Sequence, residues 1–169
     1  NVYIVYDPAN SKKKTSGHDP DYTAMMVVGL APDNNYYVLD MLRDRLNPTE
    51  RVNALIRMHQ KWNKLAGKPP KVIVEQYGMM TDAFYIKKAQ QGLSYRFPLQ
   101  EVSERLKKED RIRRLIAPFE EQRIYLPKSL IYVDINKEVV DLVESFVTEY
   151  DTIPVGRHDD MRDALSQVA

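Results

Sequence analysis

The 169-residue sequence contains no cysteine, and only six of its residues are glycine. The lack of cysteine excludes a disulfide framework, a thiolate metal site and a cysteine nucleophile, and it favours an intracellular compartment. The glycines form neither the phosphate loop G-x-x-x-x-G-K-[ST] nor the dinucleotide fingerprint G-x-G-x-x-G. Nucleotide-driven motor activity and Rossmann-type dinucleotide binding therefore have no local support in this chain.

Long hydrophobic runs are also missing. The longest, such as residues 24–31, have about eight residues, whereas a membrane-spanning helix needs about 20. The run Val2 to Tyr6 is too short for the apolar part of a secretory signal, and an acid follows it. We therefore expect neither a membrane segment nor secretion. The net charge is only +1, so local blocks of charge matter more than the total.

What is present is an ordinary globular composition, with 43% hydrophobic and 29% charged residues. The length suits about one domain of roughly 100–200 residues, and no Pro/Gly-rich linker divides the chain. We expect a single domain over residues 1–169. Because the last helical pattern stops at Ala169, we also expect the chain to be a fragment of a longer protein.

The first 45 residues are predicted to form three strands, at residues 2–7, 22–31 and 36–42. Residues 9–22 are polar, with Gly, Pro and Lys, and are expected to form a loop. The turn between the second and third strands is short, which favours antiparallel pairing.

From Asn47 onward, helices and strands are expected to alternate. Asn47 and Glu50 form the capping pair of a helix that has Pro48 at its first position and stops at Gly67. Residues 71–75 then form a short strand with a wholly apolar interior, typical of a central strand. The remaining expected elements are a helix at 81–91, a strand at 95–102, a helix at 105–119, extended pieces at 123–126 and 130–133, a helix at 136–149, a loop at 150–156 and a helix from 158. This order predicts an α/β fold with a mixed sheet flanked by helices.

Acidic residues end two of the apolar strands and open the last helix. Asp7 ends the first strand, Glu75 ends the fourth, and Asp159, Asp160 and Asp163 begin the helix. Ligand sites of open sheets gather where central strands end. A carboxylate is costly to bury there unless it is paired or bound to a cation. If the first and fourth strands are neighbours, Asp7 and Glu75 repel each other unless a cation offsets their charge.

The acids of the last helix share a face. Asp160 and Asp163 are three residues apart, and Asp159 and Asp163 are four apart. Taken alone, the segment fits a plain helix cap equally well, since the macrodipole favours acids in the first turn. With no cysteine and three histidines, oxygen ligands favour Mg²⁺ or Mn²⁺ over Zn²⁺. Two such ions about 4 Å apart stabilise the attacking and leaving oxygens of a phosphodiester hydrolysis.

Five segments follow one another along nearly the whole chain: VYIVYDPAN…HDPDYTAMMVVG, YYVLDMLRDRLNPTE, KVIVEQYG, KEDRIRRLIAPFEEQRIYLP and HDDMRDALSQVA. In this order they resemble the ribonuclease H-like superfamily, and more narrowly the C-terminal nuclease domain of the large terminase subunit of tailed bacteriophages. The closing Asp-x-x-Asp-Ala-Leu is also similar to that of RuvC-type resolvases.

The resemblance implies a ribonuclease H-like mixed sheet, three antiparallel strands plus parallel strands, flanked by helices. It implies an endonuclease that cuts double-stranded DNA concatemers during viral genome packaging with two Mg²⁺ or Mn²⁺ ions. By position it carries the catalytic metal-ligand roles onto Asp7, Glu75 and Asp160, with Asp159 and Asp163 in support. Which of Asp159 and Asp160 is the principal ligand stays open, and the resolvase spacing favours Asp160.

The same resemblance implies partners and a compartment. The partners are double-stranded DNA, an N-terminal ATPase domain in the same chain, the small terminase subunit and the portal, with no membrane. The compartment is the host cytoplasm, where the virus is assembled.

Basic residues cluster in two places. Residues 105–114 hold six basic and two acidic side chains. On a helix, part of this segment forms one stripe suited to phosphate contacts, although a merely solvated face is the alternative. The stripe consists of Lys107, Lys108, Arg111 and Arg114. In the first loop, Lys12, Lys13 and Lys14 either reach a DNA backbone or only keep the loop soluble.

Two further residues are possible auxiliaries. Asp21 precedes the second strand and either lies near Asp7 or forms a turn. His158 precedes the acids of the last helix and either assists in proton transfer or caps the helix. His59, at a core-facing helical position, is predicted to be a packed histidine. Asp40 is left outside the ligand set.

Two rival functions remain open at this stage. One is a junction resolvase or transposase-type nuclease of the same fold. The other is a catalytically silent module for DNA binding or assembly.

The basic stripe generates a first prediction. Replacing Lys107 and Lys108 together by Ala should weaken DNA binding and flatten its salt dependence. With fewer phosphate contacts, DNA binding releases fewer counterions. The measurement is DNA affinity at several salt concentrations for the variant and the unchanged chain. Equal affinities and equal slopes would show that the stripe is only a solvated face.

Overall fold

The computed structural model describes residues 1–8, 22–75, 82–102, 110, 113–151 and 160–168, and the side chain of Glu75 is outside the description. The elements in chain order are β1 (Val2–Asp7), β2 (Thr23–Leu30), β3 (Tyr36–Asp44), α1 (Pro48–Leu65), β4 (Lys71–Glu75), α2 (Asp82–Gly92), β5 (Leu99–Val102), α4 (Ile116–Glu120), β6 (Ile124–Tyr125), β7 (Ile131–Val133), β8 (Val139–Asp141), α5 (Leu142–Asp151) and α6 (Asp160–Ser166).

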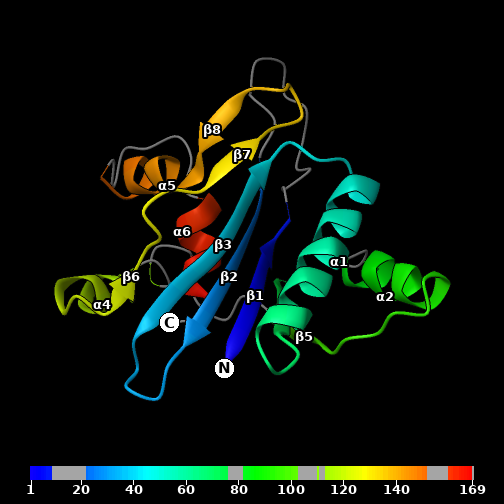
Figure 1. Ribbon diagram of the computed structural model, residues 1–169, viewed down its shortest axis with the longest axis horizontal. Helices are drawn as coiled ribbons and strands as arrows, with labels where there is room; N and C mark the ends of the chain where they lie inside the picture. Colours follow the sequence, from blue (N-terminus) through cyan, green and yellow to red (C-terminus); the bar gives the residue numbers. More distant parts are fainter. Residues whose placement is uncertain (9–21, 76–81, 103–109, 111–112, 152–159, 169) are drawn as a thin grey trace.

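The main sheet has six strands in the order β5-β4-β1-β2-β3-β6 (Figure 1). β2 runs antiparallel to both β1 and β3, whereas β4 is parallel to β1, β5 to β4 and β6 to β3. The predicted mixed sheet, with three antiparallel strands followed by parallel ones, is therefore confirmed. β7 and β8 form a separate antiparallel hairpin.

Each face of the sheet carries its own hydrophobic cluster and its own helices. On β1, Ile4 and Tyr6 belong to the cluster under α1 and α2, and Val5 belongs to the cluster under α5 and α6. Strand side chains alternate between the two faces. Asp7, two residues after Val5, therefore lies on the side of α6.

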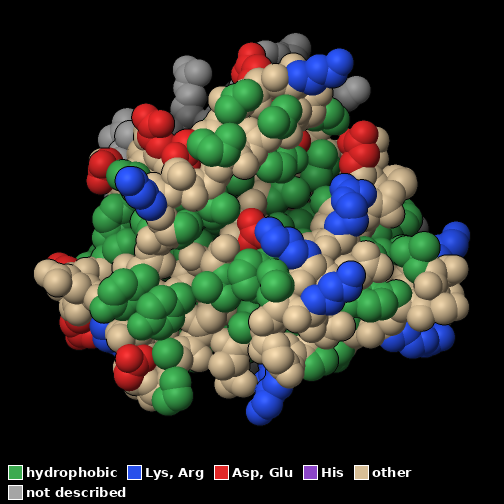
Figure 2. Space-filling view, viewed as in Figure 1, with side chains coloured by type: hydrophobic (Ala, Val, Ile, Leu, Met, Phe, Trp, Pro, Cys, Tyr) green, Lys and Arg blue, Asp and Glu red, His purple; other side chains and the backbone are tan. Residues whose placement is uncertain are grey.

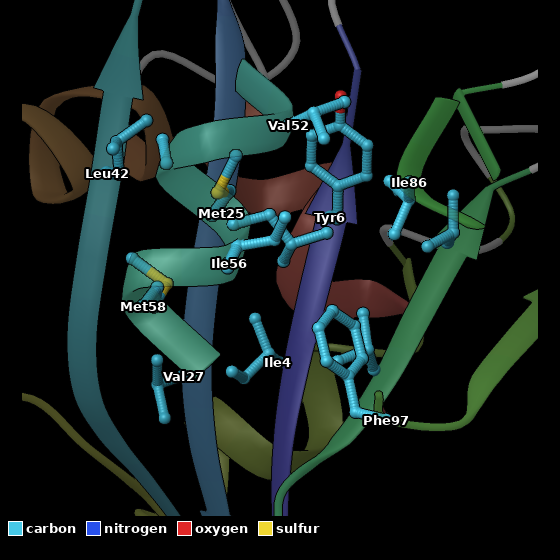
Figure 3. Packing of buried hydrophobic residues seen from close by; sticks show 14 residues of the cluster. Ile4, Tyr6, Met25, Val27, Leu42, Val52, Ile56, Met58, Ile86 and Phe97 are labelled. Atoms are coloured by element: carbon cyan, nitrogen blue, oxygen red, sulfur yellow. The ribbon is translucent and has the colours of Figure 1, made fainter. Parts of the chain in front are cut away.

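α1 is fixed at its start by a capping box. The Asn47 side chain accepts hydrogen bonds from the N–H groups of Thr49 and Glu50, at 3.0 and 2.9 Å, and the Glu50 carboxylate accepts from Asn47 N–H at 2.9 Å. The helix then lays its apolar stripe on the sheet. Figure 3 shows Val52 and Ile56 of α1 in the cluster with Ile4, Tyr6 and Met25.

His59 is a packed histidine, as predicted. Its Nδ1 lies 2.9 Å from the Tyr95 hydroxyl and its Nε2 lies 3.2 Å from the Pro70 carbonyl oxygen. Its ring stacks on Phe97 with the ring centroids 4.1 Å apart. Burial lowers the pKa of His59 from its usual value, so the neutral ring is the favoured form in this core.

The predicted helix over 105–119 is interrupted rather than continuous in the part that can be described. Asp110 and Arg113 are helical, Arg114 and Leu115 form a turn, and α4 begins at Ile116. Pro118 gives the reason, because a proline ring inside a helix clashes with the carbonyl group four residues earlier, here that of Arg114. Pro118 is instead accommodated in the first turn of α4.

The predicted helix over 136–149 is also wrong at its start. Residues 139–141 form β8, and α5 begins at Leu142 and continues to Asp151, beyond its predicted end. Val139 pairs with Val133 across the hairpin, and β-branched residues suit such pairs. The Asp141 carboxylate accepts the N–H groups of Leu130 and Val143, at 3.0 and 2.9 Å, which fixes the change from strand to helix.

The fifth strand is shorter than predicted. β5 spans Leu99–Val102 rather than 95–102. Residues before it are held by Gln90 of α2 instead of by a neighbouring strand. The Gln90 carbonyl accepts Tyr95 N–H at 3.2 Å, and its side chain accepts Phe97 N–H at 3.3 Å.

No helix within the described residues is long and apolar enough to cross a membrane.

The capping box gives a prediction on stability. Asn47→Ala should lower the free energy of unfolding by about 1 kcal/mol, because two N–H groups at the start of α1 lose their acceptor. Urea unfolding measures the difference. Asn53→Ala, at an exposed position inside the same helix, is the matched control and should not destabilise, since Ala is the better helix former. Equal losses in both variants would contradict the capping role.

Candidate metal centre

Asp7 stands at the end of the central strand β1. Its side chain is only 6% exposed. In the parallel pairing of β1 with β4, Tyr6 is in register with Val74, so the next residues along the two strands are Asp7 and Glu75. The backbone therefore brings the ends of the two acid-terminated strands together, as expected for neighbouring parallel strands.

α6 brings further acids to the same side of the sheet. It packs on β1 and β2, and its fully buried Ala164 belongs to the cluster that contains Val5 and Ala24. Asp160 shares the helix face of Ala164, four residues later, and Asp163 is three residues after Asp160. Asp163 is 1% exposed, and the Ser166 hydroxyl donates to its carbonyl oxygen at 2.6 Å.

Two alanines are small enough to let α6 pack closely on β1 and β2. Ala24 pairs with Asp7 on the next strand, and Ala164 faces the sheet from α6. A larger side chain at either position would have to fit between helix and sheet, and overpacking a core costs about 1–3 kcal/mol. The middle of α6 can therefore lie directly against β1 and β2.

A buried ion-pair group lies beside α6, among residues that no pattern in the sequence marked. Arg43 Nε lies 3.2 Å from Glu149 Oε1 and 4.0 Å from Asp160 Oδ2. The other Glu149 oxygen accepts Met161 N–H at 3.1 Å. The Arg43 guanidinium also covers the Tyr22 ring at 3.7 Å. No sequence signal marked Glu149, since an acid near the end of an amphipathic helix is ordinarily exposed.

The electrostatics of Glu149 reflect this crowding. Burial is the largest cause that raises the pKa of its carboxyl to about 7. The Asp160 carboxylate adds to the rise, and the Arg43 guanidinium opposes it. Burial and the Asp160 charge thus favour the neutral form of the Glu149 carboxyl, and Arg43 favours its charged form.

A second acidic group lies on the opposite face, under α1 and α2. The Tyr6 hydroxyl donates to the Asp82 carboxylate, which also pairs with Arg51 Nη2 at 2.6 Å. Burial and the Asp82 charge raise the pKa of the Tyr6 hydroxyl far above its usual value, so it remains a donor. Asp82 is the first residue of α2, so this group ties the start of α2 to the end of β1.

Several predicted site residues lie outside the described part of the chain. They are Lys12, Lys13, Lys14, Asp21, Lys107, Lys108, Arg111, His158 and Asp159, with the side chain of Glu75. Arg114 is described and is exposed. Among the residues that the structure does describe, no three acidic, histidine or cysteine side chains form a group that could hold one metal ion together. Asp40, left outside the predicted set, is bound to Lys61 at 2.7 Å and to Trp62 at 2.9 Å.

Figure 2 shows Lys and Arg side chains gathered over α1 and α2 on the face turned to the viewer. Lys61, Lys87 and Lys88 belong to these helices and are exposed. Lys61 and Lys87 are each paired with an acid, Asp40 and Glu101. This surface lies on the side of the sheet away from α6 and is adequately explained as a solvated helix face.

By residue type alone, the acids expected as ligands fit a hard divalent cation. Asp7, Asp160 and Asp163 offer only oxygen atoms, and cysteine is absent from the chain. Asp7 and Asp163 are nearly inaccessible to solvent, and a cation is one kind of partner that can offset the charge of a buried carboxylate. Oxygen ligands of this kind suit Mg²⁺ and Mn²⁺.

The strand order, the antiparallel β2, and the acids at the ends of β1 and β4 and on α6 define a ribonuclease H-like domain. The chain belongs to the terminase RNase H-like domain family, whose model matches residues 4–169. The resemblance seen in the sequence is thereby confirmed. No curated protein matches the chain.

Solved structures share this fold at low sequence identity. The human cytomegalovirus terminase nuclease domain, soaked with Mn and bound to an inhibitor, is 14% identical, with a TM-score of 0.69 over 98% of this chain and 80% of that chain. The large terminase nuclease of the thermophilic phage G20c, with bound magnesium, is 14% identical, with a TM-score of 0.54 over 98% and 78% of the two chains. The fowlpox virus Holliday junction resolvase is 12% identical, with a TM-score of 0.51 over 98% and 93%.

The Tyr6–Asp82 bond next to Asp7 gives a prediction. Tyr6→Phe should lower the free energy of unfolding by about 1–3 kcal/mol, because the buried Asp82 carboxylate loses a donor. Tyr3→Phe, in the same strand but part-exposed, is the control and should stay within about 0.5 kcal/mol of the unchanged chain. Thermal and urea unfolding measure both. A Tyr6→Phe variant as stable as the control would show that Arg51 alone satisfies Asp82.

Proposed function

We propose that this chain is a divalent-metal-dependent endonuclease that hydrolyses phosphodiester bonds of double-stranded DNA and cuts concatemeric viral genomes during packaging. The observation that carries the proposal is the packing of α6, which holds Asp160 and Asp163, against β1, which ends at Asp7. Membership of the terminase family and the folds of two terminase nucleases support it.

Asp7 is the central ligand of the proposed site. Glu75 is next to it on one side, at the end of β4, and the α6 acids approach from the other side over β1 and β2. Asp7 is thus the residue that two metal positions would share, one with Asp160 and the other with Glu75. Asp163 and Asp159 take supporting roles in this proposal.

The chemistry needs no protein nucleophile. When bound, two divalent ions stabilise the charge that develops on the attacking and leaving oxygens of the phosphodiester. The chain's own part is to fix carboxylate oxygens in a nearly dry site, where they keep their orientation during the reaction. The two solved terminase nucleases were obtained with Mn or Mg, which supports the choice of ion.

DNA contact is proposed for the two basic clusters. Lys12, Lys13 and Lys14 follow Asp7 closely in sequence, and Lys107, Lys108, Arg111 and Arg114 follow β5. Phosphate contacts of this kind give affinity with little sequence preference. His158 and Asp21 remain candidate auxiliaries.

The remaining proposals concern the assembly. The terminase family supports an ATPase domain N-terminal in the same chain, a small terminase subunit and a portal as partners. Packaging of this kind places the protein in the host cytoplasm, during virus assembly.

A junction resolvase is the second candidate. The fold shared with the fowlpox virus resolvase favours it, because that protein has the same architecture and is a resolvase of Holliday junctions. A four-way junction and a linear duplex of the same sequence separate the two functions. Cleavage confined to the junction would favour the resolvase.

The deciding experiment is cleavage of supercoiled plasmid with Mg²⁺, with Mn²⁺ and with EDTA. The unchanged chain should nick and linearise the plasmid with either metal and not with EDTA. Asp7→Asn and Asp160→Ala should lose at least about 100-fold in rate, since each removes a charged metal ligand. Asp33→Asn, in the exposed turn before β3, is the matched control and should cut normally.

The metal-free stability of Asp160→Ala provides an independent check. Its melting temperature should equal or exceed that of the unchanged chain, because the variant relieves repulsion between Asp160 and Glu149. A clear drop would contradict the crowded-acid picture. No cutting with any metal, together with intact DNA binding, would favour the catalytically silent module.

A further inference from the structure

Arg43 lies in the same row of the sheet as Asp7. Asp7 pairs with Ala24 of β2, and Ala24 pairs with Arg43 of β3. Because neighbouring strands are about 4.8 Å apart, the backbones of Asp7 and Arg43 are separated by roughly 10 Å. Met41, two residues earlier, belongs to the cluster under α5 and α6, so Arg43 lies on the face that carries α6.

The Arg43 side chain is held on several sides and is only 16% exposed. Its guanidinium lies on the Tyr22 ring, and its Nε faces Glu149 at 3.2 Å. Arginine suits such a place, since its planar group combines stacking with carboxylate contact. Its position and orientation are therefore well determined.

Glu149 links the fixed Arg43 side chain to the start of α6. One oxygen of the Glu149 carboxylate faces Arg43, and the other accepts Met161 N–H at 3.1 Å. The first N–H groups of a helix have no partner inside it, so an acceptor from outside fixes where the helix begins. Asp160, the first residue of α6, also lies 4.0 Å from Arg43.

We propose that Arg43 is a positioning residue for the metal ligands: it acts through Glu149 to hold the first turn of α6, so that Asp160 faces Asp7. This inference rests on the proposed function. Partners of metal ligands that fix their orientation change metal affinity about 10–100-fold when they are removed. A direct role in DNA binding is the rival explanation for an arginine at this place.

The test compares Arg43→Gln and Glu149→Ala with the unchanged chain in Mn²⁺ titrations by calorimetry, without DNA. Each variant should bind Mn²⁺ about tenfold more weakly, at the lower end of that range. The double variant should lose no more Mn²⁺ affinity than the single variant that binds Mn²⁺ more weakly, because the two residues act in one chain of contacts. Arg123→Gln is the matched control, since Arg123 also pairs with a carboxylate, Glu121, but does so beside the edge strand β6. It should bind Mn²⁺ within twofold of the unchanged chain.

The sign of the Arg43→Gln effect separates positioning from a simple charge effect. If charge alone mattered, removing the positive charge of Arg43 would strengthen the binding of a cation, because the repulsion between Arg43 and the cation would be lost. Tighter or unchanged Mn²⁺ binding by a folded Arg43→Gln variant would therefore overturn the proposal.

DNA binding in EDTA, measured by fluorescence anisotropy with a duplex, tests the rival role. Arg43→Gln should stay within twofold of the unchanged chain. A loss of DNA affinity with normal Mn²⁺ binding would overturn the proposal and assign Arg43 to a phosphate contact.

Milder variants keep the test decisive if Arg43→Gln does not fold. Arg43→Lys keeps the charge but not the planar group, and Glu149→Gln keeps an acceptor for Met161 N–H. Each should weaken Mn²⁺ binding severalfold, and normal binding by both would overturn the proposal. If the unchanged chain neither binds Mn²⁺ nor cuts DNA, the proposed function fails, and this inference fails with it.

Discussion

Parallel pairing of β1 with β4 is the constraint on which the candidate site depends. It puts Asp7 and Glu75 at neighbouring positions on one edge of the sheet, at the ends of two apolar strands. Such a meeting of like charges costs free energy unless positive charge is supplied. The pairing itself brings the ends of these two strands to the side of the sheet on which α6 packs, and this is why the candidate site is placed there.

The packing around α6 sets how close this helix comes to the end of β1 in the candidate site. Ala24 and Ala164 let the helix lie close to β1 and β2, and Arg43 and Glu149 fix where the helix starts. Buried ion pairs add little net stability, because desolvation offsets the Coulomb gain. The structure therefore assigns this group to orientation: a helix of seven residues gains a defined beginning from contacts outside itself.

The sequence predicted most of the elements correctly where one local signal dominated. The strand at 71–75, the capped helix from Pro48 and the buried His59 were each correct, because apolar patterning or a cap fixed them locally. The helix at 105–119 was wrong in its continuity, and the helix at 136–149 was wrong at its boundaries. In the first, Pro118 outweighed the basic amphipathic pattern. In the second, pairing of Val139 with Val133 across a hairpin outweighed helix propensity, and no local signal announces such a pairing.

The sequence by itself determined the fold class and the family, because these depend on residue type and order along the chain, and it predicts Asp7, Glu75 and Asp160 as the metal ligands. Tertiary structure alone decided which residues share one face and one row. The Arg43–Glu149 pair joins residues more than 100 positions apart, and the Tyr6–Asp82–Arg51 group joins three different elements. Contacts of this kind leave no periodicity or spacing in the sequence. They exist only once the sheet order and the two helical layers have placed the side chains together.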